Sequence, residues 1–323
     1  MKQKILVIGG AGYLGSMFCE KQLAQKNIVH CMDNSIYKNE YAIKKFKTNK
    51  NFKYLNFDIR KKFSNKNKYN AVIVFAGLVG DPITKKYPKE SKNINEKGIK
   101  NIVNYYKNSK IRFIFISTCS NYGFIKNKIA NERTKLRPKS LYAAQKVNIE
   151  QFIKDQKNSS KFCPTILRFA TAFGSSLRPR FDLTINEFVL NAYLKRKIDI
   201  YDHKTWRPYC HVNDFFEVIS YCLKMNEIKV KFNVFNVGSN KNNHRKIDVA
   251  KKIKKYLPHF KYKIIKNSKD PRDYRVNFQK ISKYMKLKPF KTVDYGITEI
   301  INFLKKEKNP KRFLKYGNYI LKN

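Results

Sequence analysis

Three glycines near the start of the chain have a spacing suited to phosphate binding. Gly9, Gly12 and Gly15 follow the apolar run Ile5–Ile8 and precede a helical pattern over residues 16–25. At this spacing the first glycine permits a tight turn, the second lets the backbone approach a pyrophosphate, and the third lets the helix pack closely on the strand. The free N–H groups at the helix start would face the phosphates. The segment therefore predicts a dinucleotide site.

An acidic residue ends the next predicted strand, residues 28–32. Asp33 stands roughly 20 positions after the glycines, where a carboxylate accepts hydrogen bonds from the adenosine ribose and repels a 2′-phosphate. Asn34 and Ser35 follow it, so no basic residue is at hand to bind such a phosphate. We expect NAD(H) and not NADP(H). A glycine-rich turn in another α/β protein is the alternative, and Asp33 argues against it.

A tyrosine and a lysine lie four residues apart at the start of a predicted helix. The spacing of Tyr142 and Lys146 places both side chains on one helix face. Alone this pattern is weak, because the chain contains 21 tyrosines and many lysines, and an ordinary helix face is the alternative. Their position in the chain adds weight, since they follow the Ser/Thr-rich segment 117–123 at the end of a predicted strand, and ligands of open α/β sheets bind at the carboxyl ends of strands.

The elements that position these residues alternate between apolar strands and helical patterns. Such strands are typical of a parallel sheet covered on both faces. The predicted fold class is α/β: a Rossmann-like, doubly wound parallel sheet with a smaller mixed α/β C-terminal substrate lobe. We expect an NAD-binding domain over residues 1–174, completed by a strand near 232–237, and a mainly substrate-binding lobe over 175–323. The lysine-rich segment 308–323 suggests no role.

The formal net charge of +47 admits two interpretations. It suits a nucleic-acid surface, but the lysines are spread through nearly every predicted helix and loop. Lys, Asn and Ile share AT-rich codons, so we favour genomic base composition and expect no nucleic-acid partner.

Cysteine spacing and hydropathy argue against a metal-binding protein and against a membrane protein. None of the six cysteines forms a C-x-x-C pair or a zinc-finger spacing, so we expect reduced, buried thiols and no metal site. Only Cys119 is placed to line a site. No stretch approaches the ~18 apolar residues of a membrane span, and the N-terminal apolar run is broken by glycines, unlike a signal peptide. We expect a cytoplasmic protein without a membrane partner.

Taken together, these motifs resemble the extended short-chain dehydrogenases/reductases, specifically the NAD-dependent epimerase/dehydratase family that acts on nucleotide sugars. The resemblance covers nearly the whole chain. It rests on Gly9–Gly15, Asp33, Asp58–Ile59, Phe75–Gly77, Thr118, Tyr122–Gly123, Tyr142, Lys146, Leu167–Phe169, Arg207–Asp214, Phe235–Gly238 and Asp270–Arg275.

The resemblance implies a role for each matching residue. Tyr142 is the acid/base at a sugar hydroxyl, Lys146 binds the nicotinamide ribose and lowers the tyrosine pKa, and Thr118 hydrogen-bonds the same sugar oxygen. The residues implied for NAD are Gly9, Gly12, Tyr13, Leu14, Gly15, Asp33, Asn34, Asp58, Ile59, Phe75, Ala76, Gly77, Asn95, Tyr142, Lys146 and Phe169. The residues implied for the nucleotide-diphosphate sugar are Thr118, Thr171, Arg180, Asn186, Arg207 and Arg272.

For several polar residues, the sequence alone also allows a role without ligand binding or catalysis. Asp58 could reach the adenine amino group or serve as an ordinary strand-end carboxylate. Arg178 and Arg180, in a basic loop, are candidates for phosphate or sugar contacts, or two more solvated cations of a basic protein. His211 fits a structural hydrogen-bonding role better than a catalytic one.

The family match leaves the reaction open. Its 4,6-dehydratases carry an Asp-Glu pair where this chain has Cys119 and Ser120, which argues against dehydration. We expect a nucleotide-sugar 4-epimerase. The alternative is a 4-dehydrogenase, with a GDP-heptose as a specific candidate, because residues 78–82, 178–182 and 270–275 are similar to a bacterial branch serving surface polysaccharides. A non-catalytic nucleic-acid-binding member of the fold is the third alternative. The family also implies a homodimer through residues 93–107 and 140–157.

Overall fold

A seven-stranded parallel sheet forms the centre of the molecule. The computed structural model describes residues 2–158, 161–266, 270 and 272–321. The strand order is β11-β7-β5-β4-β1-β2-β3, and every neighbouring pair is parallel. These strands are β1 Lys4–Ile8, β2 Ile28–Asp33, β3 Phe52–Asn56, β4 Ala71–Val74, β5 Ile111–Thr118, β7 Phe162–Phe169 and β11 Asn233–Val237. The predicted Rossmann-like sheet is confirmed, and its order reverses between β1 and β4, which is where such sheets bind ligands.

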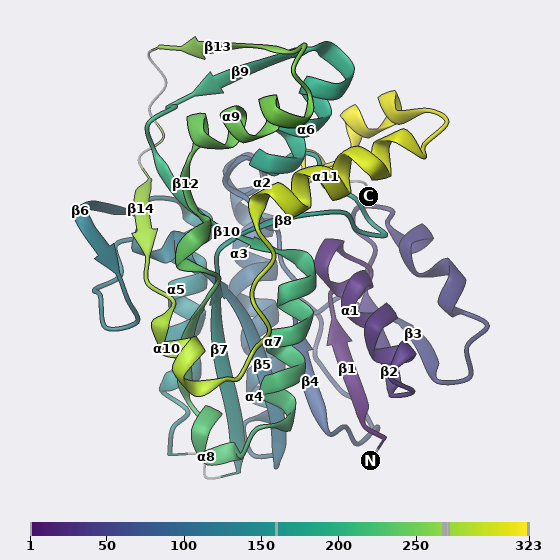
Figure 1. The fold of residues 1–323 in the computed structure, drawn as a ribbon. Coiled ribbons are helices and arrows are strands. Elements are labelled where there is room, and N and C mark those ends of the chain that lie inside the picture. Colours follow the sequence, from purple (N-terminus) through teal and green to yellow (C-terminus); the bar gives the residue numbers. More distant parts are fainter. Residues whose placement is uncertain (1, 159–160, 267–269, 271, 322–323) are drawn as a thin grey trace.

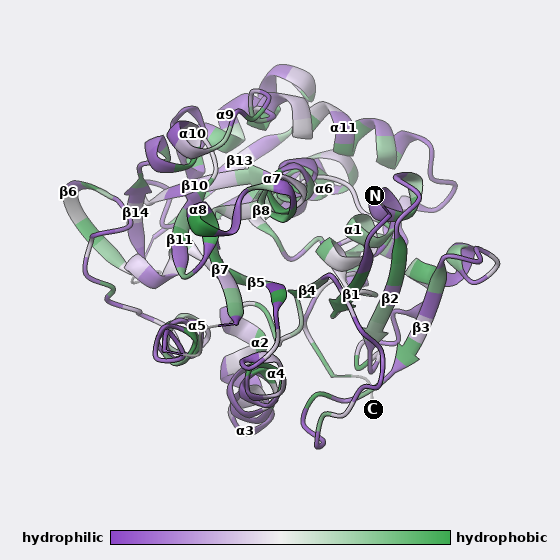
Figure 2. Ribbon diagram, turned by 90° about the horizontal axis from the view of Figure 1, so that it is seen from below, coloured by the Kyte–Doolittle hydropathy of each residue, from purple (hydrophilic) through white to green (hydrophobic). Residues whose placement is uncertain are grey.

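Helices cover both faces of this sheet, so its strands are apolar throughout. Alternate residues of β1 belong to two different cores. Ile5 and Val7 pack in the core beneath α1 (Tyr13–Ala24) and α7 (Val212–Lys224), the two helices that Figure 2 shows on one face of the sheet. Leu6 packs on the opposite face. That face carries α2 Asp81–Lys86, α3 Pro88–Lys92, a π-helical turn Asn93–Gly98, α4 Ile99–Tyr106 and α5 Leu141–Lys154.

A smaller lobe sits at the carboxyl ends of the strands (Figure 1). Its helices pack around a third apolar core, and its strands form the small sheets β12-β10-β8, β13-β9 and β14-β6. Its elements are β6 Phe124–Ala130, β8 Thr171–Phe173, α6 Thr184–Lys195, β9 Lys197–Tyr201, β10 Trp206–His211, β12 Asn243–Arg245, α9 Lys246–Tyr256, β13 Lys261–Ile265, β14 Asp273–Val276 and α11 Val293–Lys305.

The two lobes are interleaved along the chain. After β10 the chain returns to the large sheet through α7, α8 (Glu227–Val230) and β11, and α10 (Gln279–Tyr284) packs beside β11. The predicted strand near 232–237 is therefore present at the sheet edge.

The segment after α11 joins the lobes again. A short 3-10 helix, Pro310–Lys315, buries Phe313 in the core of the small lobe. Beyond it Tyr316 stacks edge-on against Tyr41 of the large lobe, and its carbonyl accepts a 2.7 Å hydrogen bond from Phe181 N. Leu321 packs against the large-lobe core. A segment for which the sequence suggested no role thus spans both lobes; residues 322–323 lie outside the described part.

Two further expectations concern the thiols and the membrane. All six cysteines are buried and unbridged, as their spacing indicated. Among the described residues, none of the helices has the length and apolar character needed to cross a bilayer.

Candidate active site

A cavity of about 550 Å³ lies between the two lobes at the carboxyl ends of β1, β2, β4 and β5. The glycine turn and Asp33 line one end. Tyr142 and Lys146 line the middle, and Arg180 and Arg272 line the small-lobe end. The sheet therefore brings the predicted nucleotide and chemical groups to one continuous space.

Glycine is required at two points of the turn. Gly9 has a φ of +82°, and a Cβ there would lie 2.5 Å from the backbone nitrogen of Ala76. A Cβ on Gly15 would lie 2.2 Å from the carbonyl oxygen of Gly9. Gly12 caps α1 without a side-chain hydrogen bond, so the first N–H groups of that helix are open to an anion.

Asp33 is held in place by the turn itself. Its Oδ2 accepts a hydrogen bond of 3.0 Å from Ala11 N, and its Oδ1 one of 2.9 Å from Ser35 N. Burial raises the pKa of Asp33, while these two bonds and the Arg178 guanidinium oppose that rise. Asp58 also lines the cavity, but it is paired with Arg60 at 2.5 Å.

The start of α5 presents the tyrosine and the lysine. Ser140 caps the helix through a 3.3 Å bond from Ala143 N to its Oγ. Lys146 is 3% exposed, and its Nζ donates a 2.8 Å bond to the carbonyl of Ile116 and lies 5.9 Å from the centre of the Tyr142 ring. Thr118, at the end of β5, lines the same wall, and its Oγ1 accepts a bond of 3.1 Å from Ser120 N.

Burial sets the proton affinities of this pair. It lowers the pKa of Lys146 to about 8, although the Glu150 carboxylate counteracts it. It raises the pKa of Tyr142, and Arg180 is the main opposing charge. A bound cation beside the tyrosine would therefore favour the phenolate.

A buried polar network fixes α5 against the sheet. Arg168 of β7 pairs with Glu150 of α5, with Nη2 and Oε2 2.6 Å apart. Ser117 Oγ and Asn121 Nδ2 donate to Glu150 Oε1 at 2.5 and 2.8 Å. Because Glu150 lies one turn after Lys146, the network locks the helix that carries the reactive pair. Asn121 is thus part of this network.

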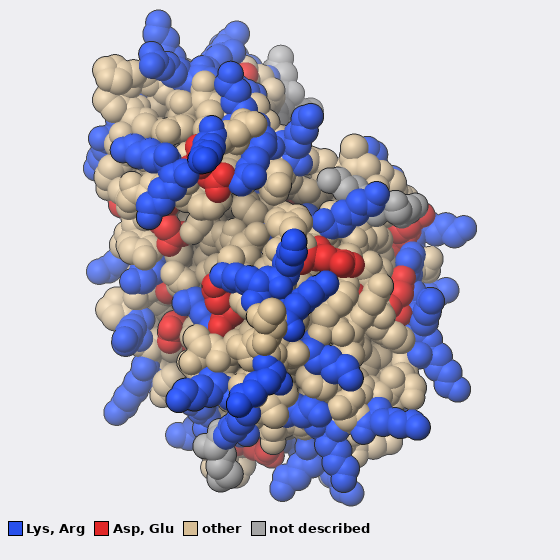
Figure 3. All heavy atoms as spheres, turned by 90° about the vertical axis from the view of Figure 1, so that its right-hand side faces the viewer, with Lys and Arg blue, Asp and Glu red and all other residues tan. Residues whose placement is uncertain are grey.

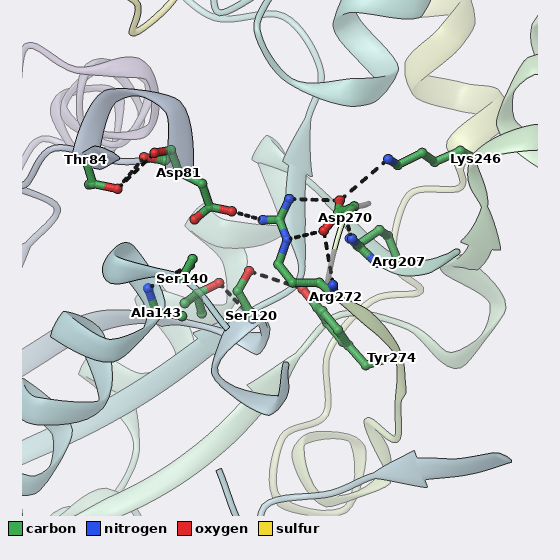
Figure 4. A network of polar contacts seen from close by, with 12 residues as sticks. Asp81, Thr84, Ser120, Ser140, Ala143, Arg207, Lys246, Asp270, Arg272 and Tyr274 are labelled. Atoms are coloured by element: carbon green, nitrogen blue, oxygen red, sulfur yellow. Dashed lines mark hydrogen bonds and ion pairs between the residues drawn. The ribbon is translucent and has the colours of Figure 1, made fainter. Parts of the chain in front are cut away.

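The small-lobe end of the cavity is lined by paired arginines. Arg180 pairs with Asp182 at 2.6 Å. Figure 4 shows Arg272 between Asp81 of the large lobe and Asp270, which also pairs with Arg207 at 2.6 Å. Burial would raise the pKa of Asp270, but Arg272 and Arg207 hold it well below its usual range.

Most sequence-predicted residues meet at this cavity. Those that line it are Gly9, Gly12, Tyr13, Leu14, Gly15, Asp33, Asn34, Asp58, Ile59, Phe75, Ala76, Gly77, Thr118, Tyr142, Lys146, Phe169, Thr171, Arg180 and Arg272.

Three predicted residues support the cavity from behind its lining. Asn95 binds Leu78 N and O at 2.7 and 3.0 Å and shapes the turn after β4. Asn186 is occupied by Gly174 N and by the carbonyls of Gly174 and Arg180. Arg207 lies behind Asp270. The expectation that Cys119 lines the site is wrong, since it is 1% exposed and its Sγ donates to Arg168 O.

Sequence reasoning missed several residues of the lining. Asp81 and Ser120 stood inside recognised segments, so their position could have suggested them. Asn318 and Tyr319 also line the cavity, and they come from the lysine-rich segment, where neither a motif nor a periodicity indicates a site.

The chain matches the family model "NAD dependent epimerase/dehydratase family" over residues 5–238. The chain belongs to this family. Its cofactor is NAD, as the glycine turn and Asp33 indicated, and its members act on nucleotide sugars.

Relatives and solved structures extend this comparison over nearly the whole chain. UDP-glucose 4-epimerase of Haemophilus influenzae is 26% identical, covering 78% of this chain and 82% of its own. ADP-L-glycero-D-manno-heptose-6-epimerase of Brachyspira hyodysenteriae is 25% identical, covering 94% and 98%. A structure of UDP-glucuronic acid 4-epimerase from Bacillus cereus, with UDP-glucuronic acid and NAD, superimposes with a TM-score of 0.82 over 94% of this chain and 99% of its own, at 20% identity. That likeness shows the shared fold.

Proposed function

We propose that this protein is a nucleotide-sugar 4-epimerase that works by reversible oxidation at C4 of the sugar. The observation that carries the proposal is the meeting of Thr118, Tyr142 and Lys146 on one cavity wall. A protein that only binds a ligand has no need of a buried lysine beside a tyrosine. The names of the relatives, which include 4-epimerases and a heptose 6-epimerase, support the substrate class.

The residues present fit the cofactor. The open N–H groups of α1 and the glycine turn would hold the pyrophosphate, Asp33 the adenosine ribose, and Lys146 the nicotinamide ribose. When bound, NAD supplies the oxidising power by accepting a hydride from the carbinol carbon.

The chain itself manages the proton and the orientation. Tyr142 takes the proton from the sugar hydroxyl and later returns it. Free tyrosine has a pKa near 10, so the Lys146 ammonium is needed to favour the phenolate. Thr118 holds the sugar oxygen while the hydride is removed from C4. Inversion then requires the 4-keto sugar to turn over in the cavity and take the hydride back on its opposite face.

The residues after Thr118 argue against dehydration. Cys119 points into the core, and Ser120 Oγ lies 3.1 Å from the hydroxyl of Tyr274. Neither position offers a carboxyl group that could remove water from a hexose. This favours epimerisation or simple oxidation within a family that also contains dehydratases.

A 4-dehydrogenase, with a GDP-heptose as one candidate substrate, is the second function. One experiment separates the two. Purified protein is incubated with UDP-, GDP-, CDP- and dTDP-sugars while NADH absorbance and C4 stereochemistry are followed. Inversion at C4 without NADH build-up supports the epimerase, and a keto product with NADH supports the dehydrogenase.

The same preparation tests the nucleic-acid alternative. Figure 3 shows lysines and arginines spread over the whole displayed face, with acidic side chains among them. This pattern favours a solvated basic surface. Inactivity with every sugar, together with RNA affinity that falls steeply with salt, would contradict the enzyme proposal.

We also propose a homodimer through the outer faces of α4 and α5. These helices lie side by side and expose Tyr105 and Leu141, each by about two fifths. Light scattering behind size exclusion should give twice the chain mass for the wild type. A monomer at micromolar concentration would contradict this assembly.

A further inference from the structure

One buried arginine on the cavity wall has no counter-ion. Arg178 is 6% exposed and lines the cavity. The other buried arginines of the described residues each lie within 4 Å of a carboxylate: Arg168 of Glu150, Arg180 of Asp182, and Arg207 of Asp270. Among the residues that the structure describes, Arg178 has no such partner. A buried charge without a counter-ion is costly, so this guanidinium is suited to receive an anion.

Neutral groups hold Arg178 in position. Its Nη1 donates a 2.6 Å hydrogen bond to Oδ1 of Asn318, and its guanidinium carbon lies 4.8 Å from the centre of the Tyr37 ring. Asn318 is fixed in turn by bonds to Val79 O and to Asp182 from its backbone nitrogen. The segment after the last helix therefore orients this cation without neutralising it.

The loop that carries Arg178 is docked on the glycine turn. Ser176 Oγ donates to Tyr13 O at 2.6 Å, and the Tyr13 hydroxyl donates to Gly174 O at 2.7 Å. Tyr13 is the first residue of α1, whose open N–H groups face the cavity. Arg178 follows this docked segment by two residues, and its guanidinium lies on the Tyr37 ring, close enough to Asp33 to affect the pKa of that carboxyl group. The arginine therefore lines the part of the cavity between the glycine turn and Asp33.

We infer that Arg178 binds the diphosphate of the NAD cofactor and that Asn318 positions it. The cofactor is then held between a helix N-terminus of one lobe and a guanidinium of the other. A planar guanidinium suits this task because it binds two phosphate oxygens at once. The inference rests on NAD as the cofactor of the family and is independent of which sugar is converted.

The nearby Asp33 favours the diphosphate over a 2′-phosphate as the anion. Its carboxylate stands at the ribose position and would repel a 2′-phosphate. Its two oxygens accept hydrogen bonds from Ala11 N and Ser35 N. Arg178 acts on this carboxyl group through its charge, and the two form no ion pair within 4 Å.

Displacement of isotopically labelled NAD from the purified holoprotein tests the inference directly. ADP-ribose, ADP and adenosine are the competitors, since the first two carry the diphosphate and the third does not. In Arg178→Met we expect ADP and ADP-ribose to bind about 10- to 100-fold more weakly, the loss typical of a hydrogen bond to a charged group, with adenosine unchanged. Arg133→Met, at an exposed arginine, is the control for the loss of one charge. Unchanged ADP-ribose affinity in Arg178→Met would overturn the inference, as would an equal loss of affinity for adenosine.

A second variant tests whether binding needs the positive charge of Arg178 and not only the packing of its side chain. Asn318→Asp would place a carboxylate against Arg178 and neutralise it while leaving the arginine in place. We expect it to weaken ADP-ribose binding in the wild-type background and to have little further effect in the Arg178→Met background. Equal effects in both backgrounds would contradict the proposed pairing. These readouts measure binding only, so an inactive sugar panel would not disturb them.

Discussion

Arg168 of β7 and Glu150 of α5 form a fork-to-fork ion pair in the centre of the molecule, with Nη2 and Oε2 2.6 Å apart and both side chains nearly inaccessible. Arg168 Nη1 also donates a 3.1 Å hydrogen bond to the Tyr122 hydroxyl. Removing the carboxylate would leave a buried guanidinium unpaired. Glu150→Gln should therefore lower the free energy of unfolding by about 3–5 kcal/mol, measured by urea denaturation.

Glu20→Gln provides the matched control for that measurement. Glu20 pairs with Lys45 at the surface, where both side chains are more than one third exposed. Such pairs contribute about 0–1 kcal/mol, so this variant should unfold almost like the wild type. An equally small effect of Glu150→Gln would mean that the buried network does not hold α5.

The catalytic role of Tyr142 is tested by removing its hydroxyl alone. Tyr142→Phe should reduce turnover by about 10²- to 10⁴-fold, the usual contribution of a positioned acid/base. NAD should bind as in the wild type, because the ring remains. Tyr201→Phe, at a half-exposed position on β9, should change neither quantity. Substantial turnover in Tyr142→Phe would exclude the proposed mechanism.

The pH dependence of Lys146 follows from its burial. In the cofactor-free protein its pKa of about 8 lies below the value of about 10.4 expected in the unfolded chain. Between these two pH values the unfolded state binds more protons, so this group favours folding increasingly as pH rises. Lys146→Met should therefore be more stable than the wild type near pH 7, and the difference should shrink between pH 8 and pH 10. Denaturant unfolding across this pH range measures the difference in free energy of unfolding between Lys146→Met and the wild type, with Lys128→Met on β6 as the control. A difference that does not change with pH would contradict the lowered pKa of Lys146.

Substrate binding is expected to depend on Arg272 and not on its near neighbour Arg275. Arg272 lines the cavity, whereas Arg275 lies 5.2 Å from the centre of the Trp206 ring. If Arg272 contacts the sugar diphosphate, Arg272→Met should raise KM by about 10- to 100-fold and leave kcat nearly unchanged. Arg275→Met also removes one positive charge, but away from the cavity, and should change KM little. Similar KM values for both variants would place the diphosphate elsewhere.

The sequence predicted the large sheet well because its signals are local. Strands such as Ile5–Ile8 and Ala71–Val74 are apolar on both faces, and the glycine turn has a fixed spacing. Residues at the carboxyl ends of neighbouring strands were also predicted, including Asp33 at the end of β2 and Thr118 at the end of β5. These residues lie at the cavity because the carboxyl ends of parallel strands meet at one edge of the sheet. Predicting this requires no knowledge of contacts between distant segments.

The small-lobe side was predicted less well because its geometry depends on contacts between distant segments. Asn186 lies in the first turn of α6, between the lining residues Thr184 and Glu187. Its amide does not reach the cavity, because it is hydrogen-bonded to the loop 174–180. Arg178 and Arg180 look alike in the sequence. Only the position of Asp182 distinguishes the paired arginine from the unpaired one. Asp182 is near both arginines in the sequence, and only the folded loop shows which of them pairs with it.

The hydrogen bond from Asn318 to Val79 joins residues 239 positions apart. Contacts between such distant residues are slow to form, because a long stretch of chain must first be ordered. The nucleotide cavity is therefore expected to close late in folding, after the parallel sheet has assembled. NAD would then bind only to the fully folded protein. The rate at which bound NAD appears during refolding would therefore give the rate of the last folding step.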